Sequence, residues 1–293
     1  MILVTGATSR SGSAIVREFA RRGTPVRALA RDAQKAAALA ALPGVHVVLG
    51  DMLRSETLGH ALDGVTRVLM ISGARERLVE TQAAFVDAAK SAGVPHVVKF
   101  SGRESGAGFD PTAFRGTRAH EEAERYLERS GLAWTHLRPS QFMQVYVPEH
   151  ARTVAADGAI YLPIDDATLA PIDVEDIARI AYAVLHAEGQ AGQRYDMTGP
   201  EALTMHDVAA RLSDATGRPV RYVPISDEDY RRRLEAARVP DDMRELLCEA
   251  YATRRRYPVS RVVLDAHARF GVAPTPFAEF ARRNAAAFRG ESA

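Results

Sequence analysis

Short runs of apolar, largely β-branched residues alternate with longer stretches of helical periodicity through the first half of the chain. The short runs predict six strands, at Ile2–Thr5, Val26–Ala30, Val45–Leu49, Arg67–Ile71, Val97–Phe100 and Trp134–Leu137. The longer stretches predict helices at Ser13–Arg22, Gln34–Leu42, Leu58–Leu62, Leu78–Ala92 and Arg118–Ser130. The strands lack polar alternation, which is typical of a sheet covered by helices on both faces. The pattern therefore predicts an α/β fold, a doubly wound parallel Rossmann sheet with strand order 3-2-1-4-5-6.

The rhythm changes after Pro139, where prolines become frequent and short extended pieces separate the helices. Helical periodicity returns at Val174–Leu185, Met205–Ala215, Asp227–Ala237, Asp241–Arg254 and Phe277–Phe288. We expect a Rossmann domain over residues 1–140, with its sheet completed by segments around 170–200. A smaller, mainly helical C-terminal substrate lobe is expected over residues 141–293, packed on the carboxyl ends of the strands, where open α/β sheets bind ligands.

Composition and charge narrow the class of protein. The 38 lysines and arginines are nearly balanced by 37 acidic residues, whereas a nucleic-acid-binding protein usually carries a basic excess. The arginine runs 231–233 and 254–256 lie in charge-mixed helical stretches and are interpreted as solvated helix faces. Apolar runs fall far short of the ~20 residues that span a bilayer. We therefore expect neither a nucleic-acid partner nor a membrane partner.

The start of the chain and its single cysteine predict a cytoplasmic protein. The first apolar run, residues 2–4, is followed at once by a glycine turn, which leaves no room for a signal peptide. Cys248 stands in an apolar setting and is interpreted as a packing residue rather than a nucleophile. The histidines are scattered without the spacing of metal ligands, so no metal is expected.

Residues 5–12 read TGATSRSG and join the first predicted strand directly to the first predicted helix. Gly6 permits a tight turn, and Gly12 lets the helix pack closely on the strand, so that backbone N–H groups face a pyrophosphate. Four more residues of the turn are predicted cofactor contacts: Thr8, Ser9, Arg10 and Ser11. A glycine-containing connection without a ligand is the alternative. The position of the turn at the start of a long αβ repeat favours a dinucleotide.

The end of the second predicted strand indicates which dinucleotide binds. NAD sites usually carry an acidic residue there, whereas this chain has Ala30 followed by Arg31. An arginine pairs with a 2′-phosphate through charge-assisted, often bidentate hydrogen bonds. Lys35 and Arg10 are candidates for additional positive charges. We therefore predict NADP(H) as cofactor, with a surface arginine at a strand end as the alternative interpretation of Arg31.

Further cofactor contacts are predicted where the third and fourth strands end. The Asp51 carboxylate is placed to accept a hydrogen bond from the adenine amino group, with Met52 against the ring. A helix N-cap is the other interpretation of Asp51, since aspartate is favoured at caps. The fourth strand ends in small residues that would let the nicotinamide ribose approach, within the run Ile71-Ser72-Gly73.

Together these motifs resemble the NmrA-like group of atypical short-chain dehydrogenases/reductases. The resemblance covers nearly the whole chain. It rests on the opening TGATxxxG, on VRALAR at the second strand and on the central run HEEAERYLERSGLAWTHLRP, residues 120–139. The runs IDVEDIA, residues 172–178, and YDMTGPEALT, residues 195–204, are similar to later landmarks of the family. The central run is the most specific of these motifs.

The resemblance implies a loop over the nicotinamide after the sixth strand. It assigns Pro139, Ser140 and Phe142 to cofactor or substrate contacts, and it places Ser101 of the fifth strand near the reactive carbon. This chain departs from the family at Ser9, where glycine is usual; its side chain either crowds the pyrophosphate or bonds to it. It departs again after Met143, where Gln144-Val145 stands in place of a frequent asparagine.

The Tyr-x-x-x-Lys pair of the better-known relatives is missing. Alignment of the helix puts Gly116 at the tyrosine position and His120 at the lysine position. His120 is the predicted proton donor, because the pKa of a histidine ordinarily lies near neutrality, and Ser101 is predicted to orient the carbonyl. The alternative for His120 is a surface histidine paired with Glu124 at i+4.

The predicted substrate is a small, flat, aromatic or quinone-like molecule. Aromatic residues flank the expected cleft, and those assigned to the substrate are Phe109, Phe142 and Tyr146, although loop aromatics are as often packing residues. The leading hypothesis is an NADPH-dependent reductase of a quinone, ketone or enone. The alternative is a non-catalytic NADP(H)-binding redox sensor acting through a protein partner, motivated by the missing tyrosine and by Ser9. A third hypothesis, an epimerase or lyase, has no dedicated residues. The sequence contains no signal for the oligomeric state.

Overall fold

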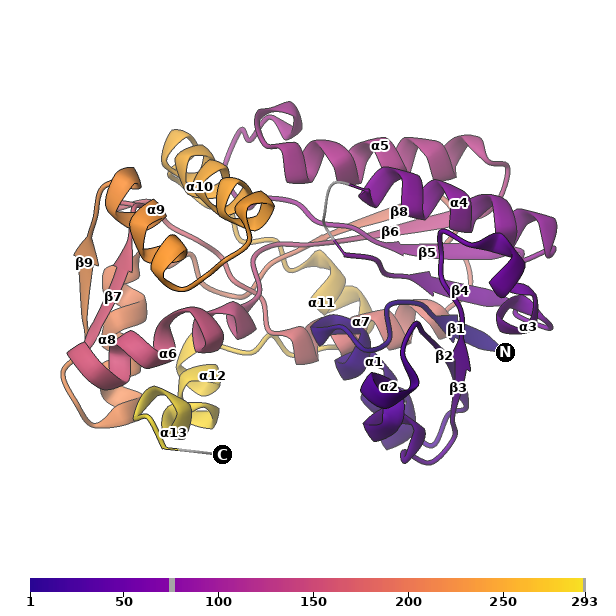
Figure 1. The fold of residues 1–293 in the computed structure, drawn as a ribbon, viewed down its shortest axis with the longest axis horizontal. Coiled ribbons are helices and arrows are strands. Elements are labelled where there is room, and N and C mark those ends of the chain that lie inside the picture. Colours follow the sequence, from indigo (N-terminus) through magenta and orange to yellow (C-terminus); the bar gives the residue numbers. More distant parts are fainter. Residues whose placement is uncertain (74–76, 292–293) are drawn as a thin grey trace.

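Seven parallel strands form the centre of the computed structural model, which describes residues 1–73 and 77–291 (Figure 1). Their order is β3-β2-β1-β4-β5-β6-β8. The strands are β1 Ile2–Val4, β2 Val26–Ala30, β3 Val45–Leu49, β4 Arg67–Met70, β5 His96–Phe100, β6 Ala133–Pro139 and β8 Gln193–Met197. The predicted doubly wound order of the first six strands is confirmed. The seventh strand, β8, pairs in register with β6, Leu137 opposite Tyr195.

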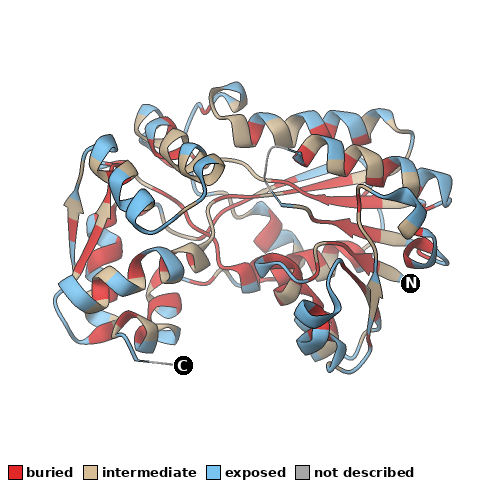
Figure 2. Cartoon of the chain, in the orientation of Figure 1, coloured by how far each residue is buried: buried red, intermediate tan, exposed pale blue. Residues whose placement is uncertain are grey.

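Alternate residues of each central strand enter two different cores, one on each face of the sheet. In β1, Val4 joins one apolar cluster and Leu3 joins the other. The first cluster lies under α1 Arg10–Arg21, α2 Ala33–Ala40 and α7 Val174–His186, and the second under α3 Gly59–Leu62, α4 Leu78–Ser91 and α5 Arg115–Arg129. Figure 2 shows the inner strands of the sheet largely buried and the helices with both buried and exposed residues, whereas the edge strands β3 and β8 are partly exposed. Burial of both faces explains why the strands lack polar alternation.

A second group of elements extends beyond the carboxyl edge of the sheet, at the left of Figure 1. Its helices are α6 Tyr146–Asp157, α8 Met205–Thr216, α9 Asp227–Ala236, α10 Asp241–Arg256, α12 Phe277–Arg283 and α13 Ala285–Phe288. They enclose a third apolar core that includes Ile160, Leu212 and Phe280. Short 3-10 turns occur at Ser55–Thr57, Pro111–Ala113 and Met143–Val145.

The structure differs from the sequence-based expectation within this lobe. Two strands that were not predicted, β7 Ala159–Leu162 and β9 Arg221–Pro224, pair in parallel. The single helix expected at residues 277–288 is interrupted at Asn284, which separates α12 from α13. The helix α11 Asp265–Phe270 was also not predicted, and it packs against β8 and α7 rather than inside the lobe.

No helix among residues 1–73 and 77–291 combines the length and the apolar character needed to cross a bilayer.

Candidate functional site

The turn between β1 and α1 requires glycine at two positions. Gly6 has a φ of +56°, and a Cβ added to it would lie 2.8 Å from the carbonyl oxygen of Ile71 on the neighbouring strand. A Cβ at Gly12 would lie 2.2 Å from the Gly6 carbonyl oxygen. The helix therefore sits directly on the turn, which is the close packing that the spacing of the two glycines predicts.

Thr5 fixes this turn against the end of β4, a role that the sequence analysis missed. Its hydroxyl donates to the Ile71 carbonyl at 2.7 Å and accepts the Ile71 N–H at 2.8 Å. The side chain is fully buried. The ends of β1 and β4 are thereby fixed side by side, where a dinucleotide would pass between them.

The amino end of α1 carries free backbone donors. Among residues 1–73 and 77–291, the N–H groups of Thr8, Arg10 and Ser11 have no hydrogen-bond partner. The Gly12 N–H is already occupied, because the Ser9 hydroxyl accepts it at 3.1 Å and caps the helix. The structure therefore uses Ser9 as an N-cap, and the free donors beside it form the type of site that binds phosphate.

The region predicted to hold the adenosine has cations at its surface. Arg31 follows the last residue of β2 and is exposed, as are Lys35 on α2 and Arg10. Asp32 caps α2 by accepting the N–H groups of Gln34 and Lys35 at 2.8 and 3.2 Å. This cap holds the first turn of α2, which carries Lys35, beside Arg31.

Asp51 and Met52, the two predicted adenine contacts, both have partners within the protein. The Asp51 carboxylate accepts the Leu53 N–H at 3.0 Å, but it does not cap a helix, because the next element is the 3-10 turn at Ser55–Thr57, which follows Arg54. Met52 is 7% exposed and packs in the core with Leu29 and Leu58. The prediction of Met52 against an adenine ring is thus at odds with the burial of its side chain.

The three residues that follow β4 differ in how accessible they are to a bound cofactor. Ile71 is buried, and its backbone is held by Thr5. The Ser72 hydroxyl accepts a hydrogen bond from the Gln82 side chain at 2.9 Å. Gly73 is exposed. Of the three, Gly73 has an open surface for a ligand.

A buried charged network lies where β5 and β6 end beneath α5. Arg138 pairs with Glu124 through its guanidinium, and the Ser101 hydroxyl donates to Glu124 Oε1 at 2.5 Å. Burial alone would raise the pKa of Glu124, but the hydrogen bonds and charges around it, chiefly those of Arg138, lower it to about 2. Ser101 therefore donates its hydroxyl proton to an ionised carboxylate, and that proton is not available to orient a carbonyl.

His120 contacts this network through a lysine that the sequence analysis missed. Its Nδ1 lies 3.2 Å from Nζ of Lys99, which is fully buried on β5. Nζ also donates to Ser101 Oγ at 3.3 Å. The alternative interpretation, a His120–Glu124 pair, does not occur, because His120 contacts Lys99 and Glu124 is engaged by Ser101 and Arg138. The sequence did contain a signal for this contact. Side chains alternate between the two faces of a strand, so Lys99 and Ser101, two residues apart, are expected on the same face of β5.

The expected near-neutral pKa of His120 is also wrong. Burial, reinforced by the Lys99 charge, lowers the pKa of His120 to about 3. Burial likewise lowers the pKa of Lys99 to about 7, against the opposing pull of Glu124. At neutral pH the imidazole is therefore neutral, and the group that titrates nearby is the lysine.

The aromatic candidates and the loop after β6 are mostly packed. Ser140 donates to the Ala170 carbonyl at 2.6 Å, and Pro139 is buried. Phe109 is 7% exposed and packs edge-on against Tyr257. Two further aromatics are covered to different degrees: Phe142 is half-buried, whereas Tyr146 is 3% exposed with a hydroxyl that has no partner among the described residues.

Glu149 of α6 is a second titratable group that the sequence analysis missed. Desolvation by surrounding protein raises the pKa of Glu149 to about 7, against the opposing charges of Arg254 and Arg10. The lobe therefore brings an acid within electrostatic reach of the cofactor turn. Arg254 pairs with Glu104 at 3.0 Å, and its side chain is 16% exposed. The interpretation of residues 254–256 as a solvated face is thus wrong for Arg254.

A cavity of about 350 Å³ with a mixed apolar and charged lining lies between α4, α5 and α10. Its lining includes Gly116 and Ala119 of α5, Leu78 of α4 and Leu246 of α10. A Cβ at Gly116 would lie 2.7 Å from the Phe114 ring, so this position has no room for a tyrosine in the present backbone. The cavity lies beside the helix that carries His120.

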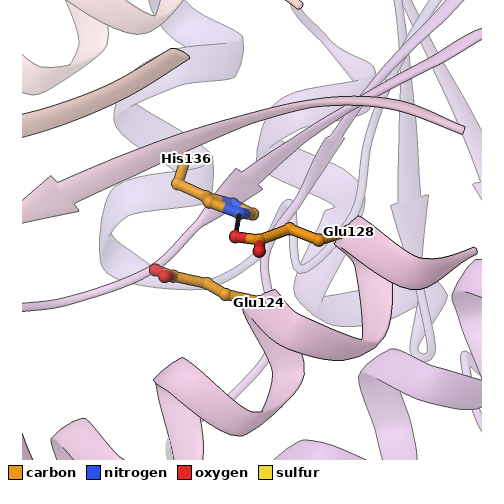
Figure 3. Close-up of side chains that lie close together, drawn as sticks. All are labelled: Glu124, Glu128 and His136. Carbon is orange, nitrogen blue, oxygen red and sulfur yellow. Dashed lines mark hydrogen bonds and ion pairs between the residues drawn. The ribbon is translucent and has the colours of Figure 1, made fainter. Parts of the chain in front are cut away.

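Glu124, Glu128 and His136 offer ligand atoms within 4.8 Å of one another (Figure 3). Glu128 Oε1 lies 3.0 Å from His136 Nε2 and 2.7 Å from the Arg194 guanidinium. Arg138 pairs with Glu124. Because each carboxylate already has an arginine partner, the arrangement is better described as an ion-pair network than as a cation site.

Comparison with known proteins places this chain among reductases. The model of the NmrA-like family matches residues 1–281. The NAD(P)H azoreductase of Xenophilus azovorans is 37% identical over 288 residues, covering 98% of this chain and 99% of the relative. The triphenylmethane reductase of Citrobacter sp., solved with NADP(H), aligns with a TM-score of 0.85 at 26% identity over 97% of this chain and 100% of that chain. An NADPH-dependent quinone oxidoreductase from Escherichia coli, solved with NADPH, has the same TM-score and identity over 97% of this chain and 99% of that chain. The chain therefore belongs to the NmrA-like family.

Proposed function

We propose that this protein is an NADPH-dependent reductase of a flat, conjugated acceptor such as a quinone, an enone or a conjugated ketone. The observation that carries the proposal is the meeting of two features at one edge of the sheet. The glycine turn with its free N–H groups follows β1, and half-buried His120 lies over the end of β5. Relatives named for the reduction of azo dyes, triphenylmethane dyes and quinones support the same class of acceptor.

The residues present fit NADPH at its two phosphate-bearing parts. The free N–H groups of Thr8, Arg10 and Ser11 suit the pyrophosphate. Arg31, with Lys35 beside it, suits the 2′-phosphate. When bound, the cofactor supplies the hydride, and the protein supplies orientation and electrostatics.

His120 is the side chain proposed to face the reduced acceptor. Its Nδ1 is occupied by Lys99, which leaves Nε2 as the nitrogen for the substrate. A neutral imidazole is a hydrogen-bond donor of moderate strength, so a conjugated acceptor suits it best, because delocalisation spreads the charge that hydride addition creates. The cavity between α4, α5 and α10, beside the helix that carries His120, is the proposed place for the flat body of such a molecule.

Binding and turnover measured together test this function. NADPH is titrated by fluorescence, and loss of absorbance at 340 nm is then followed with a quinone, an azo dye, a triphenylmethane dye, an enone and an aliphatic ketone. We expect turnover with one or more conjugated acceptors and little with the aliphatic ketone.

Two variants locate the chemistry on the helix. His120→Ala is expected to lower turnover about 100-fold with NADPH affinity retained, as loss of a general acid does. Tyr126→Phe, on the exposed side of the same helix, is expected to match wild type. Tight NADPH binding without turnover of any acceptor would contradict the proposal and support the sensor hypothesis, which the Ser9 cap at the cofactor turn keeps open.

A further inference from the structure

We propose that Lys99 is a positioning residue of this reductase: it holds the His120 ring with its proton on Nε2 and replaces that proton from the buried side when it is transferred. The inference rests on the proposed function. The lysine of the missing Tyr-x-x-x-Lys pair would then have a counterpart on a strand instead of on the helix.

The contacts of Lys99 fix the tautomer of His120. Lys99 Nζ lies 3.2 Å from His120 Nδ1 and 3.3 Å from Ser101 Oγ. A protonated lysine has three donors and no acceptor, so Nδ1 of the neutral ring must accept and the ring proton must lie on Nε2. The contact of Lys99 with Nδ1 thus makes Nε2 the nitrogen that can donate a hydrogen bond to the substrate.

The other edge of the His120 ring lies along the carboxyl end of β5. A Cβ at Gly102 would lie 3.5 Å from Cδ2 and 3.6 Å from Nε2 of His120, which is ordinary contact distance. Among residues 1–73 and 77–291, Nε2 has no hydrogen-bond partner. The donor that Lys99 creates is therefore not used by any of the residues that the structure describes.

The surroundings of Lys99 allow its proton to leave and return. The groups facing it are Ser101 on its own strand, His120 and Glu124 on α5, and Arg138 and His136 on β6. Burial lowers the pKa of Lys99 to about 7, with Glu124 opposing the shift and Arg138 adding to it. A proton donor with a pKa close to the working pH is the efficient kind.

The proposed step conserves atoms, electrons and protons. A hydride with its electron pair passes from reduced cofactor to acceptor, which is reduced while the cofactor is oxidised. The His120 Nε2–H bond breaks as an O–H bond forms on the acceptor, and a Lys99 N–H bond breaks as the Nδ1–H bond forms. Lys99 is left as a neutral amine. A solvent proton taken up at Nε2 returns the Nδ1 proton to Lys99 and restores the starting state.

The test is the pH dependence of single-turnover hydride transfer at saturating NADPH, in wild type, Lys99→Met and Lys90→Met. Lys90 is an exposed lysine of α4 and serves as control. The wild-type rate is expected to fall as the pH rises through about 7, because Lys99 then loses its proton. In Lys99→Met this inflection disappears and the rate at low pH falls about 100-fold, with NADPH affinity retained. Lys90→Met keeps the wild-type profile.

A Lys99→Met enzyme that keeps the inflection, or that keeps the wild-type rate, would overturn the inference while leaving the reductase itself intact. Failure of the proposed function has a different signature, because wild type would then oxidise no NADPH with any acceptor. If Lys99→Met does not fold, the nitrogen chemical shifts of His120 in wild type decide. A protonated Nε2 and an accepting Nδ1 support the inference, and a proton on Nδ1 contradicts it.

Discussion

Gly12 has less room for a side chain than Gly6, the other glycine of the cofactor turn, because the helix rests on the Gly6 carbonyl at this point. Gly12→Ala is expected to push α1 away from the turn, lower stability by about 1–3 kcal/mol and weaken NADPH binding at least about 10-fold. Thermal unfolding and an NADPH titration measure both effects.

The matched control for that substitution is Gly59→Ala on α3. A Cβ at Gly59 meets nothing within 4 Å, and its φ is not positive. This variant is expected to bind NADPH as wild type does and to be as stable or slightly more so, since alanine favours helix. Equal behaviour of the two variants would contradict the close packing at Gly12.

Side-chain environment was the least predictable property at this scale. The sequence identified His120 and Ser101, yet it suggested a near-neutral histidine and a free serine. Their actual states depend on Lys99, which reaches His120 from β5, and on Glu124, which reaches Ser101 from α5. A pKa is set by burial and by neighbours distant in sequence, so residue identity alone does not give it.

At the scale of elements, the Glu124–Arg138 pair fastens α5 to β6. Removing one partner leaves the other charge buried without compensation. Arg138→Met is therefore expected to lower the free energy of unfolding by about 3–5 kcal/mol, and the double variant Glu124→Gln/Arg138→Met is expected to recover part of the loss. Urea unfolding at neutral pH measures both.

The same pair gives stability a predictable pH dependence. The pKa of Glu124 falls from its ordinary 4.5 to about 2 in the folded protein, so its contribution is complete above pH 4.5 and is lost as the pH falls through about 2. Glu124→Gln should flatten this part of the stability profile. A double variant no more stable than Arg138→Met would contradict the account of the pair.

Elements with strong periodicity were predicted from sequence, and those with short or interrupted patterns were not. The first six of the seven strands of the sheet follow from β-branched runs, and β2 and β3 match their predicted bounds. The paired strands β7 and β9 are only four residues each and bring together segments far apart in the chain. Such pairing depends on tertiary contacts that no local pattern carries.

At the scale of the whole molecule, the chain leaves the sheet after β6 and later returns to it. Helix α7 packs against α1 over one face of the sheet, and β8 extends the edge at β6. The lobe between and after these segments carries Glu149 and α10 to the carboxyl edge, where the cofactor turn and His120 lie. The return of the chain completes the candidate site, and the sequence predicted it only as segments around 170–200 that complete the sheet.

Arg31 provides the most direct test of the central claim, that the opening turn and the end of β2 hold NADPH. Dissociation constants for NADPH and NADH are measured for wild type, Arg31→Ala and the exposed control Arg129→Ala. A charge-assisted contact contributes about 1.5–3 kcal/mol, so Arg31→Ala is expected to weaken NADPH binding at least about 10-fold and to leave NADH binding nearly unchanged. Arg129→Ala is expected to bind both cofactors as wild type does. Equal losses for NADPH and NADH in Arg31→Ala, or no loss for either, would contradict the account.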